Sequence, residues 1–118
     1  MMVGNGVDII EVKRVRQAVQ KWGDDFLKRV FTEKELKNAK SRGAVYEHLA
    51  GRFAAKEAVF KALLDKEISW KEIEISNDQD GRPVCAILKK IKNKPQVHVS
   101  ISHVKNYAVA SAVITQKT

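Results

Sequence analysis

The chain has 118 residues, of which 44% are hydrophobic and 31% are charged. This length fits one domain, residues 1–118, with a core that removes roughly two-thirds of the unfolded surface from water. The composition excludes a disordered tail, the single Cys excludes a disulfide framework, and no apolar run approaches the ~20 residues that cross a bilayer. We therefore expect one cytoplasmic domain with no membrane partner.

Positive charge is the unusual feature of the composition. Lys and Arg total 22 against 14 Asp and Glu, which gives a formal net charge of +8. Such a surface attracts a nucleic acid, a phosphorylated ligand, an acidic protein or a membrane surface. Aromatic residues make up only 7%, so the chain lacks the array of rings on which single-strand binders stack bases. Charge by itself leaves these partners open.

The N-terminal half is predicted to contain one strand and then helices. Residues 3–10 are largely apolar and β-branched, interrupted by Gly4 and Gly6, which favours a strand whose backbone closely approaches a neighbour. The segment that starts at Asp8 resembles a capping box, so Asp8 is a candidate cap for a helix that ends at Gly23. Three further helices are predicted, the second opened by a capping box at Thr32, over residues 24–30, 32–40 and 44–65.

The C-terminal half changes to the alternating pattern of strands. Short strands are predicted over residues 73–75, 84–88 and 97–102. Residues 107–115 are almost continuously apolar, which predicts a strand covered on both faces. One strand, several helices and then a run of strands indicate an α+β domain, with an antiparallel sheet, a long central helix and shorter helices.

Two acidic residues stand in apolar surroundings, where a carboxylate needs a partner. Asp8 lies among glycines and apolar residues, and Glu57 lies about 40° from Phe53, at the edge of the apolar stripe of the long helix. Two carboxylates without a His or Cys cage suit a hard cation such as Mg²⁺, which completes its shell with water and substrate phosphate. The alternatives are structural: a helix cap for Asp8, and an i,i+4 ion pair between Glu57 and Lys61.

Three cationic side chains are candidates for neutralising phosphate charge. Lys61 lies about 40° from Glu57 on the long helix. Arg52 lies about 140° from Glu57, so it must serve a different phosphate or a neighbouring chain. His103 follows the strand 97–102 and can donate to a phosphate oxygen, and its alternative role is a structural hydrogen bond.

Other chemistries lack the residues that they need. Cys85 lies within a predicted strand, as a small core residue without an activating base. The glycines at positions 4 and 6 lack the third glycine of a dinucleotide fingerprint and the ending of a P-loop. Ser100, Ser102 and His103 have no acid in a triad order. These observations disfavour a nucleophilic hydrolase.

The first predicted helix carries a basic face outside its apolar stripe, made by Lys13, Arg14, Arg16 and Lys21. A basic helix face is usually only solvated. The net charge of +8 nevertheless raises the expectation that an acidic surface docks against it.

Three motifs together resemble one enzyme family. They are GNGVDIIEVKRV near the N-terminus, FTEKEL followed by LAGRFAAKEAVFKAL, and HVSISHVKNYAVASAVI near the C-terminus. In this order and at these spacings they are similar to the holo-acyl-carrier-protein synthase family, the small bacterial type of 4′-phosphopantetheinyl transferase. The likeness spans nearly the whole chain and is looser between residues 66 and 94.

The resemblance implies a fold, an assembly and a reaction. The fold is the α+β phosphopantetheinyl transferase fold, assembled as a homotrimer with active sites between subunits. The reaction transfers the phosphopantetheine arm of coenzyme A to a serine hydroxyl of apo acyl carrier protein and releases adenosine 3′,5′-bisphosphate. The resemblance thereby also implies a role in fatty acid biosynthesis.

The resemblance also implies roles for single residues. Asp8 and Glu57 match the Mg²⁺ ligands of the family, which makes them catalytic together with Lys61. Lys61, Arg52 and His103 match positions associated with the coenzyme A phosphates. Arg14 matches a basic helix position that faces the acidic carrier protein in the family, and Lys21 extends this docking face.

Phosphoryl transfer explains why no protein nucleophile is evident, because it needs in-line positioning and charge neutralisation. Mg²⁺ and Lys61 would offset charge as the serine oxygen attacks the β-phosphorus. The base that removes the serine proton stays open between a metal-bound water and a carboxylate. The rival hypothesis is a non-enzymatic module that binds nucleic acid or acidic protein. It explains the charge but not the two acids, so we expect no nucleic-acid partner.

Overall fold

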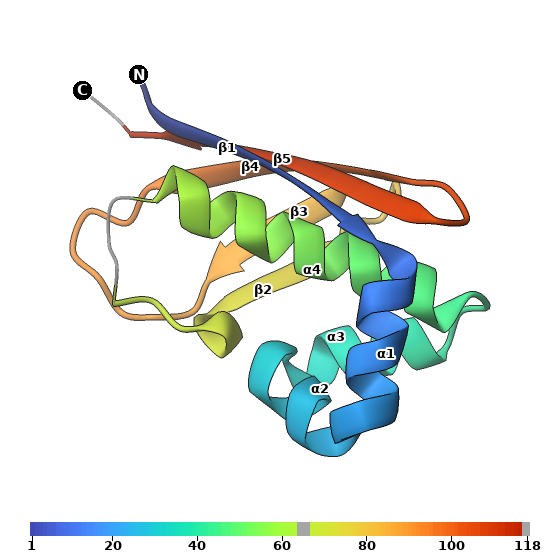
Figure 1. The fold of residues 1–118 in the computed structure, drawn as a ribbon. Coiled ribbons are helices and arrows are strands. Elements are labelled where there is room, and N and C mark those ends of the chain that lie inside the picture. Colours follow the sequence, from blue (N-terminus) through green and yellow to red (C-terminus); the bar gives the residue numbers. More distant parts are fainter. Residues whose placement is uncertain (64–66, 117–118) are drawn as a thin grey trace.

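A computed structural model describes residues 1–63 and 67–116 and has the expected α+β architecture (Figure 1). The described helices are α1 (Val12–Trp22), α2 (Asp24–Val30), α3 (Glu33–Lys40), α4 (Val45–Ala62) and the short 3₁₀ helix η1 (Trp70–Glu72). The described strands are β1 (Met2–Glu11), β2 (Ile73–Asn77), β3 (Pro83–Ile87), β4 (Gln96–His103) and β5 (Tyr107–Thr115). The predicted end of the long helix at residue 65 lies outside the described residues.

The strands pair antiparallel, as predicted, and in the described ranges they form two sheets. β1, β5 and β4 form a three-stranded sheet in that order, and β2 pairs with β3 in a hairpin. The first and last strands are therefore neighbours, and the amino group of Met1 donates to the carbonyl oxygen of Gln116 at 3.0 Å. Figure 1 shows α4 between the three-stranded sheet and the hairpin, with α1, α2 and α3 gathered at one end.

Helix α4 lies at the centre of the core because small side chains allow its neighbours to approach. Five of its alanines are at most 4% exposed. Four of them, Ala54, Ala55, Ala58 and Ala62, pack in one apolar cluster with alternate residues of β5 and with the isoleucines of β2. Although α4 is the longest described helix, neither it nor any other helix among residues 1–63 and 67–116 is long and apolar enough to cross a membrane.

β1 crosses α4 in direct contact because glycine occupies both crossing positions. A Cβ atom at Gly4 would stand 2.2 Å from the carbonyl oxygen of Ala62, and one at Gly6 would stand 2.2 Å from that of Ala58. These distances leave no room for a side chain, so the backbone of β1 lies on the helix. The crossing brings Asp8, the next residue on the same face of β1, beside α4.

We expect Gly6→Ala to destabilise the protein by about 1–3 kcal/mol, because the added methyl group must push β1 away from α4. Urea unfolding measures this change. Gly43→Ala is the matched control, since a Cβ atom at Gly43 meets nothing within 4 Å. Its free energy of unfolding should change by less than about 0.5 kcal/mol. Equal stability of the two variants would show that the crossing tolerates a side chain.

Two expectations about the strands are wrong. Asp8 does not cap a helix, because β1 continues through Glu11, which pairs with Tyr107 of β5, and α1 begins at Val12. The ladder with β5 outweighs the local capping pattern. Within residues 1–63 and 67–116, β5 is covered on one face only: its alanines are buried, whereas Tyr107 and Val109 are exposed. The continuous apolar pattern therefore leaves an uncovered apolar face on the sheet.

The predicted capping box at Thr32 is confirmed. The Thr32 hydroxyl accepts a hydrogen bond from the N–H of Glu35 at 3.2 Å, and the Glu35 carboxylate accepts one from the N–H of Thr32 at 2.9 Å. Two N–H groups at the start of α3 are thereby satisfied. The start of this helix is fixed by residues only three positions apart.

Candidate functional site

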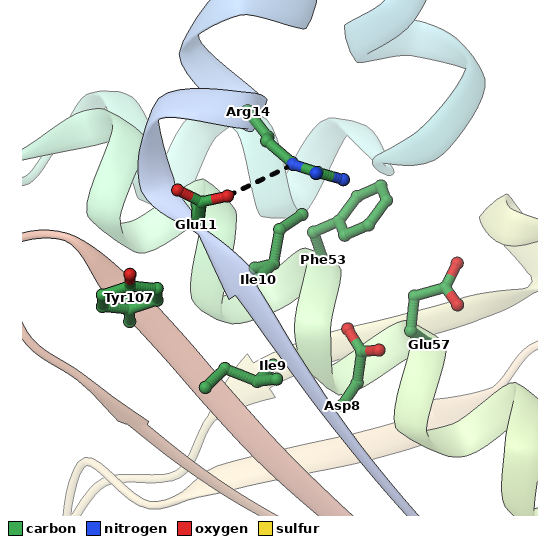
Figure 2. A pocket seen from close by; sticks show the side chains of 8 residues that line it. All are labelled: Asp8, Ile9, Ile10, Glu11, Arg14, Phe53, Glu57 and Tyr107. Atoms are coloured by element: carbon green, nitrogen blue, oxygen red, sulfur yellow. Dashed lines mark ion pairs between the residues drawn. The ribbon is translucent and has the colours of Figure 1, made fainter.

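Asp8 and Glu57, the two acids singled out from the sequence, line one hollow between β1 and α4. Figure 2 shows the two side chains entering it from the strand and from the helix. The hollow has a volume of about 450 Å³, and Arg14 and Phe53 contribute to its wall. Asp8 lies beside α4 because alternate residues of β1 face the helix, whereas the neighbouring Ile9 is exposed on the other face.

Lys61 supplies a positive charge beside the two acids. Its Nζ lies 3.2 Å from Oδ1 of Asp8 and donates to the carbonyl oxygen of Val7 at 3.0 Å. In the part of the chain that the structure describes, Lys61 forms its ion pair with Asp8 and not with Glu57. The alternative i,i+4 ion pair between Lys61 and Glu57 is therefore not formed.

The Glu57 carboxylate lacks full compensation for its charge. Partial burial, and then repulsion from Asp8, raise the pKa of Glu57 above its ordinary value, while Lys61 acts in the opposite direction. A divalent cation between the two carboxylates would remove this repulsion. Perturbed carboxyl groups of this kind gather at functional sites.

The donor atoms of the hollow decide which metal fits. Among the described side chains, no group of three or more His, Cys, Asp and Glu could hold an ion. Glu11 also lines the hollow but is paired with Lys13 and Arg14. The remaining two carboxylates, Asp8 and Glu57, fit Mg²⁺, which takes one or two protein carboxylates and keeps positions for water and substrate phosphate. Zn²⁺ would require three or four protein ligands.

Arg52 and His103 lie together in a second hollow of about 180 Å³. Arg52 is buried and donates to the side-chain oxygen of Asn77 at the end of β2. His103 Nδ1 lies 3.6 Å from a carboxylate oxygen of Glu47. The predicted site residues therefore lie in two separate locations. Asp8, Glu57 and Lys61 lie at the first hollow or beside it, and Arg52 and His103 line the second hollow.

Two further residues of this second hollow, Arg42 and His48, were not predicted. The ring centroids of His48 and His103 are 5.7 Å apart. Burial, and then the charges of Arg42 and Arg52, lower the pKa of His48. His48 lies four residues before Arg52, so helical spacing could have revealed it. Arg42 lies outside the helices, where the sequence carries no such signal. Two arginines supply positive charge around this small hollow, and the two histidines can donate hydrogen bonds, which together suit an anion such as phosphate.

Arg14 and Lys21 share one face of α1, because seven residues make almost two helical turns. Arg14 lines the hollow that contains the two acids, and its Nε lies 3.4 Å from Oε1 of Glu11 (Figure 2). Lys21 lies farther along the helix, with its Nζ 4.8 Å from the centroid of the Trp22 ring. The predicted docking face therefore begins at the mouth of this hollow.

Comparison with known proteins decides the family. The family model described as the 4′-phosphopantetheinyl transferase superfamily matches residues 4–112. A holo-[acyl-carrier-protein] synthase of Thermodesulfovibrio yellowstonii is 47% identical over 98% of this chain and 100% of that protein. The chain belongs to the holo-[acyl-carrier-protein] synthase family. The synthase of Protochlamydia amoebophila is 45% identical, over 96% of this chain and 98% of that protein.

Solved structures of this synthase family have the same fold. The Bacillus anthracis synthase in complex with CoA (3′,5′-ADP) has a TM-score of 0.85 and 40% identity, with 99% of each chain covered. The Helicobacter pylori synthase in complex with coenzyme A has a TM-score of 0.82 and 30% identity, over 94% of this chain and 99% of that chain. The predicted family and α+β fold are confirmed, and the chain is a phosphopantetheinyl transferase enzyme.

A buried ion pair that the sequence did not reveal holds the helix that carries Glu57. Nζ of Lys56 lies 2.6 Å from Oε1 of Glu35 and donates to the carbonyl oxygens of Val30 and Trp70 at 2.8 and 2.9 Å. Both charged side chains are fully buried. Because Lys56 directly precedes Glu57, these bonds fix the rotation of α4 in the synthase fold. The only signal in the sequence is a Lys within the otherwise apolar run FAAK.

Proposed function

We propose that residues 1–118 act as one catalytic domain that transfers the 4′-phosphopantetheine arm of coenzyme A to a serine hydroxyl of apo acyl carrier protein. The names of the relatives support the carrier protein as acceptor, and two related structures are complexes with coenzyme A or a part of it. The observation that carries the proposal is that Asp8 and Glu57 line one hollow, with Lys61 paired to Asp8 beside it.

In the proposed reaction the serine oxygen bonds to the β-phosphorus of coenzyme A. The bond from that phosphorus to the bridging oxygen breaks, the serine proton passes to a general base, and adenosine 3′,5′-bisphosphate leaves with the bridging oxygen and its electron pair. Asp8 and Glu57 would hold Mg²⁺, which supplies charge neutralisation at the diphosphate when bound. Lys61, now paired with Asp8, is placed to donate to a diphosphate oxygen on which charge develops.

Intact-mass spectrometry tests this function. The protein is incubated with coenzyme A and apo acyl carrier protein, in Mg²⁺ or in EDTA. We expect the carrier to gain one phosphopantetheine in Mg²⁺ and nothing in EDTA. The absence of any gain in Mg²⁺ would overturn the function, and an equal gain in EDTA would remove the metal from it.

We also propose a homotrimer in which neighbouring subunits share each active site. The outer face of the three-stranded sheet carries cross-strand neighbours Ile9 and Val109, which are 66% and 37% exposed, and Val7 lies beside them. An apolar patch of this kind marks an interaction surface. Arg52 and His103 occupy a separate hollow from the two acids, which supports a neighbouring chain as the source of cations for the remaining phosphate of coenzyme A.

Mixed trimers test the shared site. Asp8→Asn and Arg52→Gln chains should each be almost inactive, after circular dichroism has shown that they fold. Trimers assembled from equal amounts of both should regain about a quarter of the wild-type activity, because one site in four then combines an intact Asp8 with an intact neighbouring Arg52. A mixture as inactive as its components would place both residues in the site of a single chain.

We further propose that Arg14 and Lys21 dock the acidic carrier protein. Arg14→Glu should raise the KM for carrier protein by roughly tenfold or more and leave the KM for coenzyme A nearly unchanged, because like charges then face each other. Initial rates at varied concentrations of each substrate measure both constants. Lys90→Glu, at an exposed position after β3, is the control with the same change in net charge. An unchanged carrier KM in Arg14→Glu would remove Arg14 from the docking face.

A further inference from the structure

Glu11 has an unusual environment at the junction of β1 and α1. It stands at the N-cap of α1, yet its side chain makes no capping hydrogen bond. Its Oε1 instead lies 3.4 Å from Nε of Arg14, and its Oε2 lies 3.5 Å from Nζ of Lys13. The same side chain lines the hollow that contains Asp8 and Glu57. The Glu11 carboxylate therefore forms ion pairs with Lys13 and Arg14 and does not cap the start of α1.

The ion pair leaves one edge of the Arg14 guanidinium available. Figure 2 shows Glu11 on the Nε side of the group, with the two terminal nitrogens on the side away from Glu11. Within residues 1–63 and 67–116, Glu11 is the only carboxylate that forms an ion pair with Arg14. The free edge of a guanidinium is a planar fork that fits a second carboxylate.

We propose that Glu11 is a positioning residue that holds Arg14 at the mouth of the hollow, with its terminal nitrogens free for a carboxylate of the incoming carrier protein. The inference rests on the proposed function, because it takes the carrier protein as the partner and Arg14 as its contact. Glu11 acts through Arg14 and does not touch the reacting atoms.

Glu11 should strengthen carrier binding because it immobilises the Arg14 side chain before the carrier protein docks. The Arg14 side chain is 72% exposed, and immobilising a long flexible side chain at an interface weakens binding by about 2- to 12-fold. Glu11 restricts Arg14 before the carrier arrives and removes part of this loss. Repulsion between Glu11 and the acids of the carrier is small, because two cations within 3.5 Å neutralise Glu11 and salt screens the remainder.

Glu11→Gln tests the inference, because Gln keeps the size of the side chain and loses its charge. We expect the KM for apo acyl carrier protein to rise about 3- to 10-fold, while the KM for coenzyme A stays within about twofold of wild type. In an Arg14→Met background the same substitution should have no effect on the carrier KM. Glu33→Gln, at an exposed position of α3, changes the net charge equally and should leave all constants unchanged.

Glu11→Asp is the second variant, since it keeps the charge but shortens the reach. Its carrier KM should lie between those of wild type and Glu11→Gln. The inference is overturned by a carrier KM that is unchanged, that falls, or that rises equally in both backgrounds. Failure of the proposed function looks different, because the wild-type protein then modifies no carrier at all. Failure of the inference alone leaves wild-type turnover intact and removes only the coupling between Glu11 and Arg14.

Discussion

Glu57→Gln is expected to lower the transferase rate at saturating substrates by about a thousandfold or more, while the protein stays folded. Gln keeps the shape of the side chain but removes one of the two charges proposed to hold the cation, and a thousandfold corresponds to about 4 kcal/mol. Burial and Asp8 both disfavour the ionised Glu57, as its raised pKa shows. Removing that charge should therefore leave the free energy of unfolding equal or slightly higher.

Intact-mass kinetics measure the rate of this variant, and thermal unfolding measures its stability. Glu33→Gln makes the same chemical change at an exposed position of α3 and should keep full activity. Full activity of Glu57→Gln at low Mg²⁺ would exclude Glu57 as a metal ligand. If activity falls only in proportion to the fraction of protein that is folded, Glu57 has a structural role and no role in the reaction.

Lys56→Met is expected to destabilise the protein by about 3–5 kcal/mol, because it leaves the Glu35 carboxylate buried without its cation. Burial lowers the pKa of Lys56, and the contacts with Glu35 act in the opposite direction. The ammonium group also donates to the carbonyl oxygens of Val30 and Trp70, which would lose this donor. Urea denaturation measures the change in the free energy of unfolding.

The double variant Glu35→Gln/Lys56→Met separates two effects of Lys56→Met. One is the unpaired charge of the buried Glu35 carboxylate, and the other is the loss of the hydrogen bonds that Lys56 donates. The Gln side chain is neutral, and its oxygen can still accept from the N–H groups of Thr32 or Ile75. The double variant should therefore be more stable than Lys56→Met alone. Lys37→Met, at an exposed position of α3, should change stability by less than about 0.5 kcal/mol. An equally small change in Lys56→Met would show that the buried pair does not stabilise the fold.

Local signals predicted the regular elements well where the interacting residues are close in sequence. The bounds of α2 and β5 agree with the predicted residues 24–30 and 107–115. The capping pattern at Thr32 was reliable because its partner, Glu35, lies three positions away. The similar pattern at Asp8 misled, because pairing with β5, near the other end of the chain, extends β1 through Glu11. A capping motif cannot report a distant strand that competes for the same residues.

The acid pair of the candidate site was predictable, but its surroundings were not. Asp8 and Glu57 stood out because a carboxylate among apolar residues needs a partner. The helical angle between Glu57 and Arg52 also indicated separate locations, which the two hollows show. The pair of Glu35 and Lys56 escaped prediction because it joins α3 to α4, and the period of a single helix carries no information about the element that packs against it.

The most direct test of the account is a crystal of the protein grown with coenzyme A and Mn²⁺, which takes the oxygen ligands of Mg²⁺ and scatters X-rays anomalously. We expect one anomalous peak within coordination distance of the carboxylates of both Asp8 and Glu57 and of the diphosphate. A peak that neither carboxylate contacts, or two peaks that divide the carboxylates between them, would contradict the account.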